Sequence, residues 1–201
     1  SSDLGDALNK SVESVTWLGN DESLQPRSRE SLNIQTKATL ERNAGNINDF
    51  ANSIRAMRRH EIERIGLAWM SGVIDDEASL AGMTDVYDAA IEASLQWAIR
   101  HRINDMQLEQ APAAIAIIGM GRYGGREVNF SSDADVIIIY RPAEGADDTQ
   151  ANLFARKVQE DLRAILQGPT TFEPKIELDM DLRPEGKNGP LVRSYASCEE
   201  Y

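Results

Sequence analysis

The chain begins with stretches in which apolar residues recur every three or four positions, the spacing of one helical face. This pattern is clearest in 47–70, where charged residues fill the other positions, so an amphipathic helix is predicted there. Further helices are expected in 4–18, 29–42 and 84–101. Residues 1–110 are therefore predicted to form a helical region that packs on the remainder of the chain.

The pattern changes in the second half of the chain. A short aliphatic run at 113–118 and a β-branched run at 135–140 predict two buried strands, whereas 147–166 has helical spacing again. Residues 176–182 alternate strictly between apolar and acidic side chains, which predicts a half-buried strand with carboxylates on one face. Helices followed by strand, strand, helix and strand indicate an α+β fold, with a sheet domain over 111–201.

Composition narrows the class of protein. The 201 residues are 41% hydrophobic and 27% charged, as in globular proteins, so a disordered chain is excluded. The single Cys198 and the two histidines rule out an internal disulfide and a thiolate or all-histidine metal centre. The net charge of −12 argues against a nucleic-acid partner, and no apolar run approaches the roughly 20 residues that span a membrane. We expect a cytoplasmic protein and, because the chain lacks an initial Met, a piece of a longer one.

A glycine-rich loop follows the first predicted strand. Gly119, Gly121 and Gly124 match the dinucleotide pattern G-x-G-x-x-G. That fingerprint requires a helix across the sheet and then a second strand that ends in an acid about 20 residues on. Here the next strand begins near Asp135, too soon for such a crossover, with its acids at the start. A Rossmann fold is therefore disfavoured, although NADH binding would revive it.

Three carboxylates suggest a different chemistry for the same loop. Asp133 and Asp135 are two apart at the mouth of a strand, which places both on one face. Asp179 stands on the acidic face of the last strand, and the three converge if that strand lies beside the second. Mg²⁺ prefers hard oxygen ligands and shares them with substrate phosphates, and such a set suits two ions about 3.5–4 Å apart. The alternative, a solvated strand start, does not account for the adjoining glycines.

The two motifs together resemble a known family. The run 119–136 resembles the signature of the glutamine synthetase adenylyltransferases, nucleotidyltransferases with a DNA polymerase β-like fold. Residues 182–192 resemble the family's second signature, and the helix at 47–70 is similar to the helical segment before the catalytic sheet. The resemblance covers most of the chain.

The resemblance implies a reaction. One half of the family's long chains transfers AMP from ATP to a tyrosine of glutamine synthetase with release of pyrophosphate, and the other half removes AMP with phosphate. The details of both signatures are most similar to the C-terminal, adenylylating half of an actinobacterial type. The removing half, and a degenerate module kept for regulation, stay open as alternatives. A nucleotidyltransferase acting on RNA or an antibiotic is disfavoured by the charge and the second signature.

The resemblance also implies roles for individual residues. The metal ligands and catalytic acids are Asp133, Asp135 and Asp179, and the nucleotide-binding residues are Gly119, Gly121, Arg122, Gly124, Ser131, Ser132, Arg183 and Lys187. Arg122 stands where the superfamily has a serine, and Asp181 where an arginine is common, which leaves open whether Asp179 or Asp181 assists the metal. Arg183 has an alternative role in a structural salt bridge to Glu177 or Asp181.

The implied cofactor is Mg²⁺, with two ions, and the implied substrate is ATP. The implied partners are glutamine synthetase as protein substrate, the remaining half of the full-length enzyme, and a nitrogen-signalling PII-type protein that acts through regions outside this chain.

Overall fold

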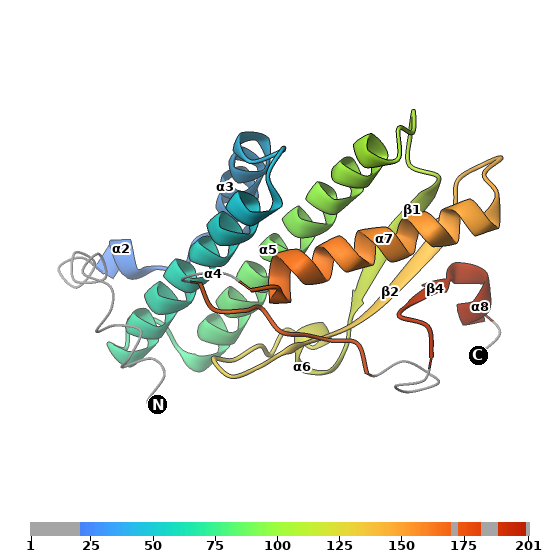
Figure 1. The fold of residues 1–201 in the computed structure, drawn as a ribbon. Coiled ribbons are helices and arrows are strands. Elements are labelled where there is room, and N and C mark those ends of the chain that lie inside the picture. The colour runs from blue at the N-terminus through green and yellow to red at the C-terminus, as the bar shows by residue number, and fades with distance from the viewer. Residues whose placement is uncertain (1–20, 170–172, 182–188, 200–201) are drawn as a thin grey trace.

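The computed structural model describes residues 21–169, 173–181 and 189–199 (Figure 1). In chain order its elements are α2 (Asp21–Leu24), α3 (Arg29–Arg42), α4 (Ile47–Met70), α5 (Asp76–Asp105), β1 (Ala113–Gly119), α6 (Gly121–Gly124), β2 (Ala134–Pro142), α7 (Asp148–Gln167), β3 (Leu178–Asp179), β4 (Val192–Ser194) and α8 (Tyr195–Glu199). This mixture of helices and one sheet confirms the α+β class. The helix expected in 4–18 lies outside the described residues.

Helix α5 is longer than the sequence pattern predicts. The carboxylate of Asp75 accepts a hydrogen bond from the Ala78 N–H, so the helix begins there and not near residue 84. Its first turns were missed because small buried residues such as Ser79 and Gly82 give no apolar stripe. Helices α3, α4 and α7 agree with the predicted ranges to within one residue at each end. Among the described helices, none is long and apolar enough to cross a lipid bilayer.

Strand β2 is the centre of the sheet. Strand β1 pairs antiparallel with it along its whole length, with Ile117 opposite Ile138. Strands β3 and β4 pair in parallel with successive parts of the other edge of β2. A dinucleotide fold needs β1 and the next strand to run parallel through a helical crossover, so the antiparallel pairing excludes the Rossmann interpretation.

Strand β3 is shorter than the predicted range 176–182. The Ile176 N–H donates to the carbonyl of Leu166 at the end of α7, at 2.8 Å, and is therefore used by the helix and not by a neighbouring strand. Pairing with β2 is confined to Leu178 and Asp179. The strict alternation still holds on the buried side, because Ile176, Leu178 and Met180 are all buried.

One hydrophobic core joins the helices to the sheet. Helix α7 lies over the sheet, and α4 and α5 pack against α7 (Figure 1). Phe154, Leu162 and Ile165 of α7 are fully buried in a cluster that also includes residues of α4, α5 and β2. Burying side chains of this size stabilises the fold by about 1.5–3 kcal/mol each.

A buried arginine connects α4 to the end of α7. Arg55 has an exposed fraction of 0%, and its Nε donates to the carbonyl of Ile165 at 2.8 Å while Nη2 donates to that of Ala164 at 3.4 Å. The last carbonyls of a helix have no partner within the helix and carry partial negative charge. Arg55 therefore caps α7 from a helix that lies more than a hundred residues earlier in the chain.

Candidate metal and nucleotide site

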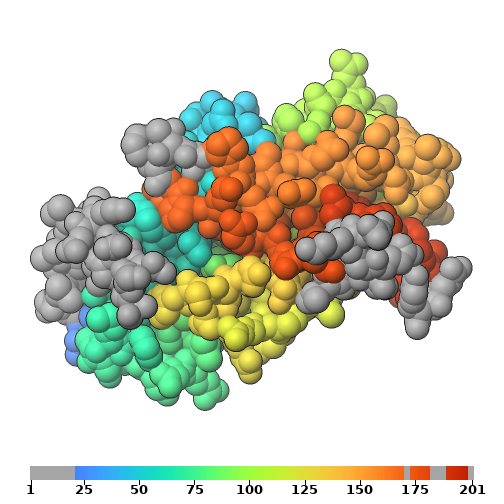
Figure 2. Space-filling model, turned by 60° about the horizontal axis from the view of Figure 1, so that its bottom comes forward, coloured from blue at the N-terminus to red at the C-terminus, as the bar shows by residue number. Residues whose placement is uncertain are grey.

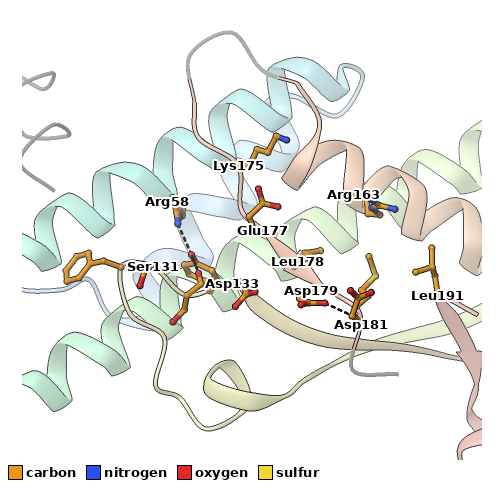
Figure 3. Close-up of a pocket in the computed structure, with 14 residues that line it drawn as sticks. Arg58, Ser131, Asp133, Arg163, Lys175, Glu177, Leu178, Asp179, Asp181 and Leu191 are labelled. Atoms are coloured by element: carbon orange, nitrogen blue, oxygen red, sulfur yellow. Dashed lines mark hydrogen bonds between the residues drawn. The ribbon is translucent and has the colours of Figure 1, made fainter. Parts of the chain in front are cut away.

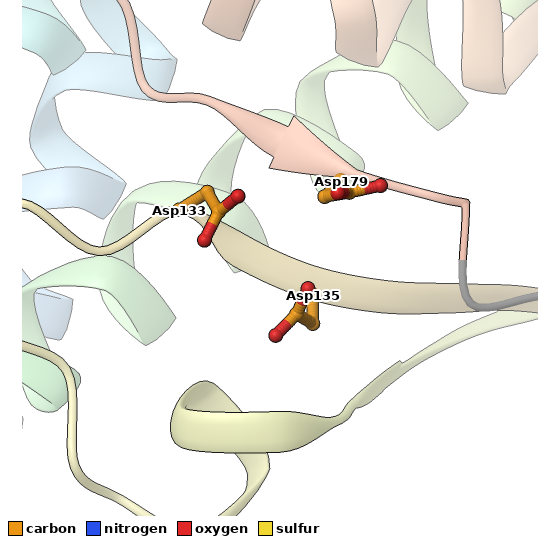
Figure 4. A group of neighbouring side chains, drawn as sticks. All are labelled: Asp133, Asp135 and Asp179. Carbon is orange, nitrogen blue, oxygen red and sulfur yellow. The ribbon is translucent and has the colours of Figure 1, made fainter.

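Three aspartates meet where β2 and β3 begin to pair (Figure 4). Asp135 on β2 stands opposite Asp179 on β3 in the parallel register, and Asp133 precedes β2 by one residue. One carboxylate oxygen from each lies within 4.8 Å of the other two. The condition for the three carboxylates to converge, that the last acidic strand lies beside the second strand, is therefore met.

The cluster concentrates negative charge. Burial raises the pKa of Asp135 above its usual value, the charges of Asp133 and Asp179 raise it further, and Arg122 opposes them. In the part of the chain that the structure describes, no other group of three acids, histidines or cysteines is arranged to hold a metal ion. An octahedral Mg²⁺ with ligands at about 2.0–2.1 Å needs oxygens about 3–4 Å apart, so small side-chain movements would let this donor set hold the ion.

The glycine loop forms a tight turn against Asp135. The Met120 N–H donates to the Asp135 carbonyl at 2.8 Å, so the loop and β2 are held together. Gly121 has a φ of +51°, and a Cβ there would lie 2.3 Å from the Asp135 Oδ2. A Cβ on Gly124 would lie 2.5 Å from the Gly119 carbonyl oxygen. Gly121 therefore lets backbone approach the carboxylate, whereas Gly119 and Gly124 allow the turn to close. Arg122 projects from this turn and is exposed.

The two serines predicted to assist phosphate binding form the turn that leads into Asp133. The Ser132 Oγ accepts from the Asn129 N–H at 3.1 Å, and the Ser131 N–H and Oγ both donate to the Asn129 Oδ1. Both serines line the hollow beside Asp133. Arg183 and Lys187 lie outside the described residues, as does the alternative pairing of Arg183 with Glu177 or Asp181.

Helix α5 supports both sides of the acid cluster. On one side the Tyr87 hydroxyl donates to the Ser132 carbonyl at 3.1 Å. On the other, the Tyr123 hydroxyl of the glycine turn donates to Asp88 at 2.6 Å. Burial and the Asp88 carboxylate raise the pKa of Tyr123 far above its usual value, so this phenol stays protonated as a donor. The glycine turn and the serine turn are thus both anchored to the same helix.

A hollow of about 630 Å³ opens above Asp133 and Asp179 (Figure 3). Figure 2 shows that α7, the start of β2 and the segment before β3 reach the same face of the molecule. Besides the predicted acids and serines, the lining includes cationic side chains from three segments, namely Arg58 of α4, Arg163 of α7 and Lys175. Asp181 also reaches this hollow, and its N–H donates to the Asp179 Oδ1 at 2.7 Å.

The sequence pattern of α4 favours a salt bridge on a solvated face for Arg58, with a contact to the other half of the full protein as the alternative, whereas the structure places its guanidinium against Tyr87. Its Nη2 donates to the Tyr87 hydroxyl at 2.7 Å, and the guanidinium carbon lies 5.2 Å from the centroid of that ring. A signal was available, because Arg58 is four residues after Ile54 and seven before Ile65, on the apolar stripe of α4. A charged residue on such a stripe indicates a buried polar role.

A mixed sheet with a carboxylate cluster beside a tight glycine turn defines a class, that of α+β proteins with a candidate divalent-metal site. Comparison with known proteins gives the family. The family described as glutamate-ammonia ligase adenylyltransferase matches residues 1–201. The chain belongs to this family.

Individual relatives agree with this assignment. The chain is 74% identical over 198 residues to the bifunctional glutamine synthetase adenylyltransferase/adenylyl-removing enzyme of Bifidobacterium longum (strain DJO10A), a match that covers 98% of the chain and 18% of that protein. It is 44% identical over 147 residues to the protein of the same name from Mycobacterium tuberculosis (strain CDC 1551 / Oshkosh), covering 73% of the chain and 14% of that protein. The chain therefore spans about a fifth of the length of the curated relatives it matches.

Proposed function

We propose that this chain is a nucleotidyltransferase unit with a DNA polymerase β-like sheet, and that it transfers AMP from ATP to a tyrosine of glutamine synthetase. The observation that carries the proposal is the convergence of Asp133, Asp135 and Asp179 beside the Gly121 turn, in a member of this family. The names of the relatives support glutamine synthetase as the substrate and AMP addition or removal as the reaction. The remaining half of the enzyme, a PII-type regulator and a cytoplasmic setting belong to the same proposal.

The three aspartates would hold two Mg²⁺ ions, which supply charge neutralisation for the phosphates and a lower pKa for the attacking phenol. The turn at Gly121 brings its backbone close to the Asp135 carboxylate, where its N–H groups would contact the phosphates, and the exposed Arg122 would add a positive charge for the triphosphate. Ser131 and Ser132 fix the approach of Asp133 to the site. A tyrosine has an ordinary pKa near 10, so the cluster must assist removal of its proton.

The test is calorimetric titration of ATP into the chain, first with Mg²⁺ and then with EDTA. We expect binding that requires the metal and is lost in Asp135→Asn, while Glu41→Gln, which removes an exposed carboxylate of α3, binds as the original chain does. Melting curves on both variants show whether each is folded. ATP binding that persists in EDTA, or in folded Asp135→Asn, contradicts the proposed site.

The direction of the reaction has its own experiment. Glutamine synthetase incubated with the chain, Mg²⁺ and ATP labelled at the α-phosphate should become labelled, and pyrophosphate should appear. If labelled, adenylylated synthetase instead loses its AMP only when phosphate is added, with ADP as product, the chain has the removing activity.

A further inference from the structure

The hollow above the acid cluster continues along α7 as a groove. Arg163 and Leu191 line both this hollow and a second one of about 620 Å³, which reaches Asn152 and Arg156. Asn152, Arg156, Gln159 and Arg163 follow one another at spacings of four, three and four, so they form one stripe of the helix. At 1.5 Å per residue, the stripe is about 16 Å long, which matches about five residues of extended peptide.

Several cationic side chains line the groove. Arg58, Lys175, Arg163 and Arg156 line it, and within the described structure none of the four forms an ion pair with a carboxylate. Arg29, Arg59 and Arg102 of the helices differ in this respect, since all three are paired with acids.

Acidic side chains also reach the groove. Apart from the metal cluster they are Glu160, Glu177 and Asp181. Outside the metal cluster the four cations exceed these acids by one charge, but Asp133 and Asp179 of the cluster line the hollow too, so without metal the lining has five acids against four cations. The two Mg²⁺ ions of the proposed function would bring four positive charges against the three carboxylates of the cluster, so the metal-loaded groove is positive.

The acid cluster separates this groove from the glycine turn. Asp135 faces the turn, because its Oδ2 is the atom that a Cβ on Gly121 would meet. Asp133 and Asp179 face the hollow, which Asp135 does not line. Figure 4 shows the same arrangement, with Asp135 toward α6 and the other two toward β3.

We propose that the groove along α7 binds the segment of the protein substrate that carries the tyrosine, and that acidic side chains flank this tyrosine. The proposal rests on the proposed function, in which the triphosphate occupies the glycine turn. In an in-line displacement the attacking and leaving oxygens lie on opposite sides of the α-phosphorus, so the tyrosine must enter from the groove. The new bond joins the phenolic oxygen to the α-phosphorus, the bond to pyrophosphate breaks, and the phenolic proton passes to water.

The test uses two exposed arginines of the groove that have no assigned role in the nucleotide site. The variant Arg156→Gln/Arg163→Gln removes two charges, and Lys37→Gln/Arg42→Gln on α3 removes two exposed charges elsewhere as the matched control. The probe is a fluorescein-labelled peptide of nine residues, with a central tyrosine, two glutamates on each side and alanine elsewhere. A second peptide has glutamine in place of each glutamate. Binding is measured by fluorescence polarisation at low salt, and MgATP binding by calorimetry.

We expect the original chain to bind the glutamate peptide more tightly than the glutamine peptide. The groove variant should weaken glutamate-peptide binding by about tenfold and leave MgATP binding unchanged, while the control pair changes neither. Equal binding of the two peptides, or equal weakening by both pairs of substitutions, overturns the proposal. Weaker MgATP binding with unchanged peptide binding would overturn it too, since the groove would then hold the nucleotide.

The two proposals fail separately. If neither the original chain nor any variant binds MgATP while the original chain still prefers the glutamate peptide, the nucleotide site is contradicted and the groove remains a peptide site. Normal metal-dependent ATP binding with no peptide selectivity contradicts the groove and leaves the proposed function standing.

Discussion

Replacing Gly121 by alanine separates the geometry of the metal site from the stability of the fold. A Cβ at this position would lie 2.3 Å from the Asp135 Oδ2, whereas ordinary contact needs about 1 Å more, so the carboxylate must rotate away. The backbone strain of an alanine at φ +51° costs about 1–2 kcal/mol in addition. Gly145 provides a matched control, because its φ is +76° and no atom lies within 4 Å of the Cβ position.

We expect Gly121→Ala and Gly145→Ala to lower the melting temperature by similar amounts, about 2–4 °C for each kcal/mol in a chain of this size. Only Gly121→Ala should weaken MgATP binding, since a metal ligand displaced by about 1 Å no longer fits a site with strict geometry. In AMP transfer the same displacement should cost about 10²-fold. The reasoning is refuted if Gly121→Ala binds MgATP as tightly as Gly145→Ala does.

Three further changes test the fold. Arg55→Met leaves the carbonyl of Ile165 without its donor, so the free energy of unfolding in urea should fall by about 2–4 kcal/mol, and a loss below 1 kcal/mol would contradict the capping role. Leu162→Ala creates a cavity in the core and should lower the free energy of unfolding by about 2–5 kcal/mol in the same assay. An unchanged urea midpoint would contradict this prediction. Burial raises the pKa of Glu61 above its ordinary value despite the charge of Arg64, so the folded state holds this proton more tightly and stability falls as pH rises from about 4.5 into the raised range. The difference in unfolding free energy between Glu61→Gln and the original chain should therefore shift in favour of the variant as the pH rises through this range. A difference that does not change with pH would contradict the raised pKa of Glu61.

The sequence predicts best those elements that bury one face and expose the other. Helix α4 shows a regular apolar stripe, and α7 follows the acidic cap Asp147, so their ranges are evident from the chain. The start of α5 is buried through small residues, which give no apolar pattern. Strand β3 is shortened because the Ile176 N–H donates to the Leu166 carbonyl of α7. Both effects depend on distant parts of the chain, so the local sequence does not predict them. The division of the chain near residue 110 stays a prediction.

The acid cluster shows the same contrast. The spacing of Asp133 and Asp135 follows from the period of a strand, so their common face was predictable. Their meeting with Asp179 required β3 to pair with β2, which the sequence suggested only as a condition. Lys175 and Arg163 come to the same hollow from separate segments, and no local pattern marks them. Their roles as ligands or contacts stay predictions until the binding experiments are done.

The two tyrosine hydrogen bonds that join α5 to the serine and glycine turns have a mechanical consequence. Tyr87 holds the serine turn on one side of the aspartates, and Asp88, its neighbour in the chain, holds Tyr123 of the glycine turn on the other. Because the two bonds are made at neighbouring residues of α5, a shift of this helix would act on both turns in the same direction. The Met120 N–H bond to the Asp135 carbonyl and the pairing of β2 with β3 also hold the aspartate cluster together, so a force on α5 from elsewhere in a longer enzyme would act on both turns at once.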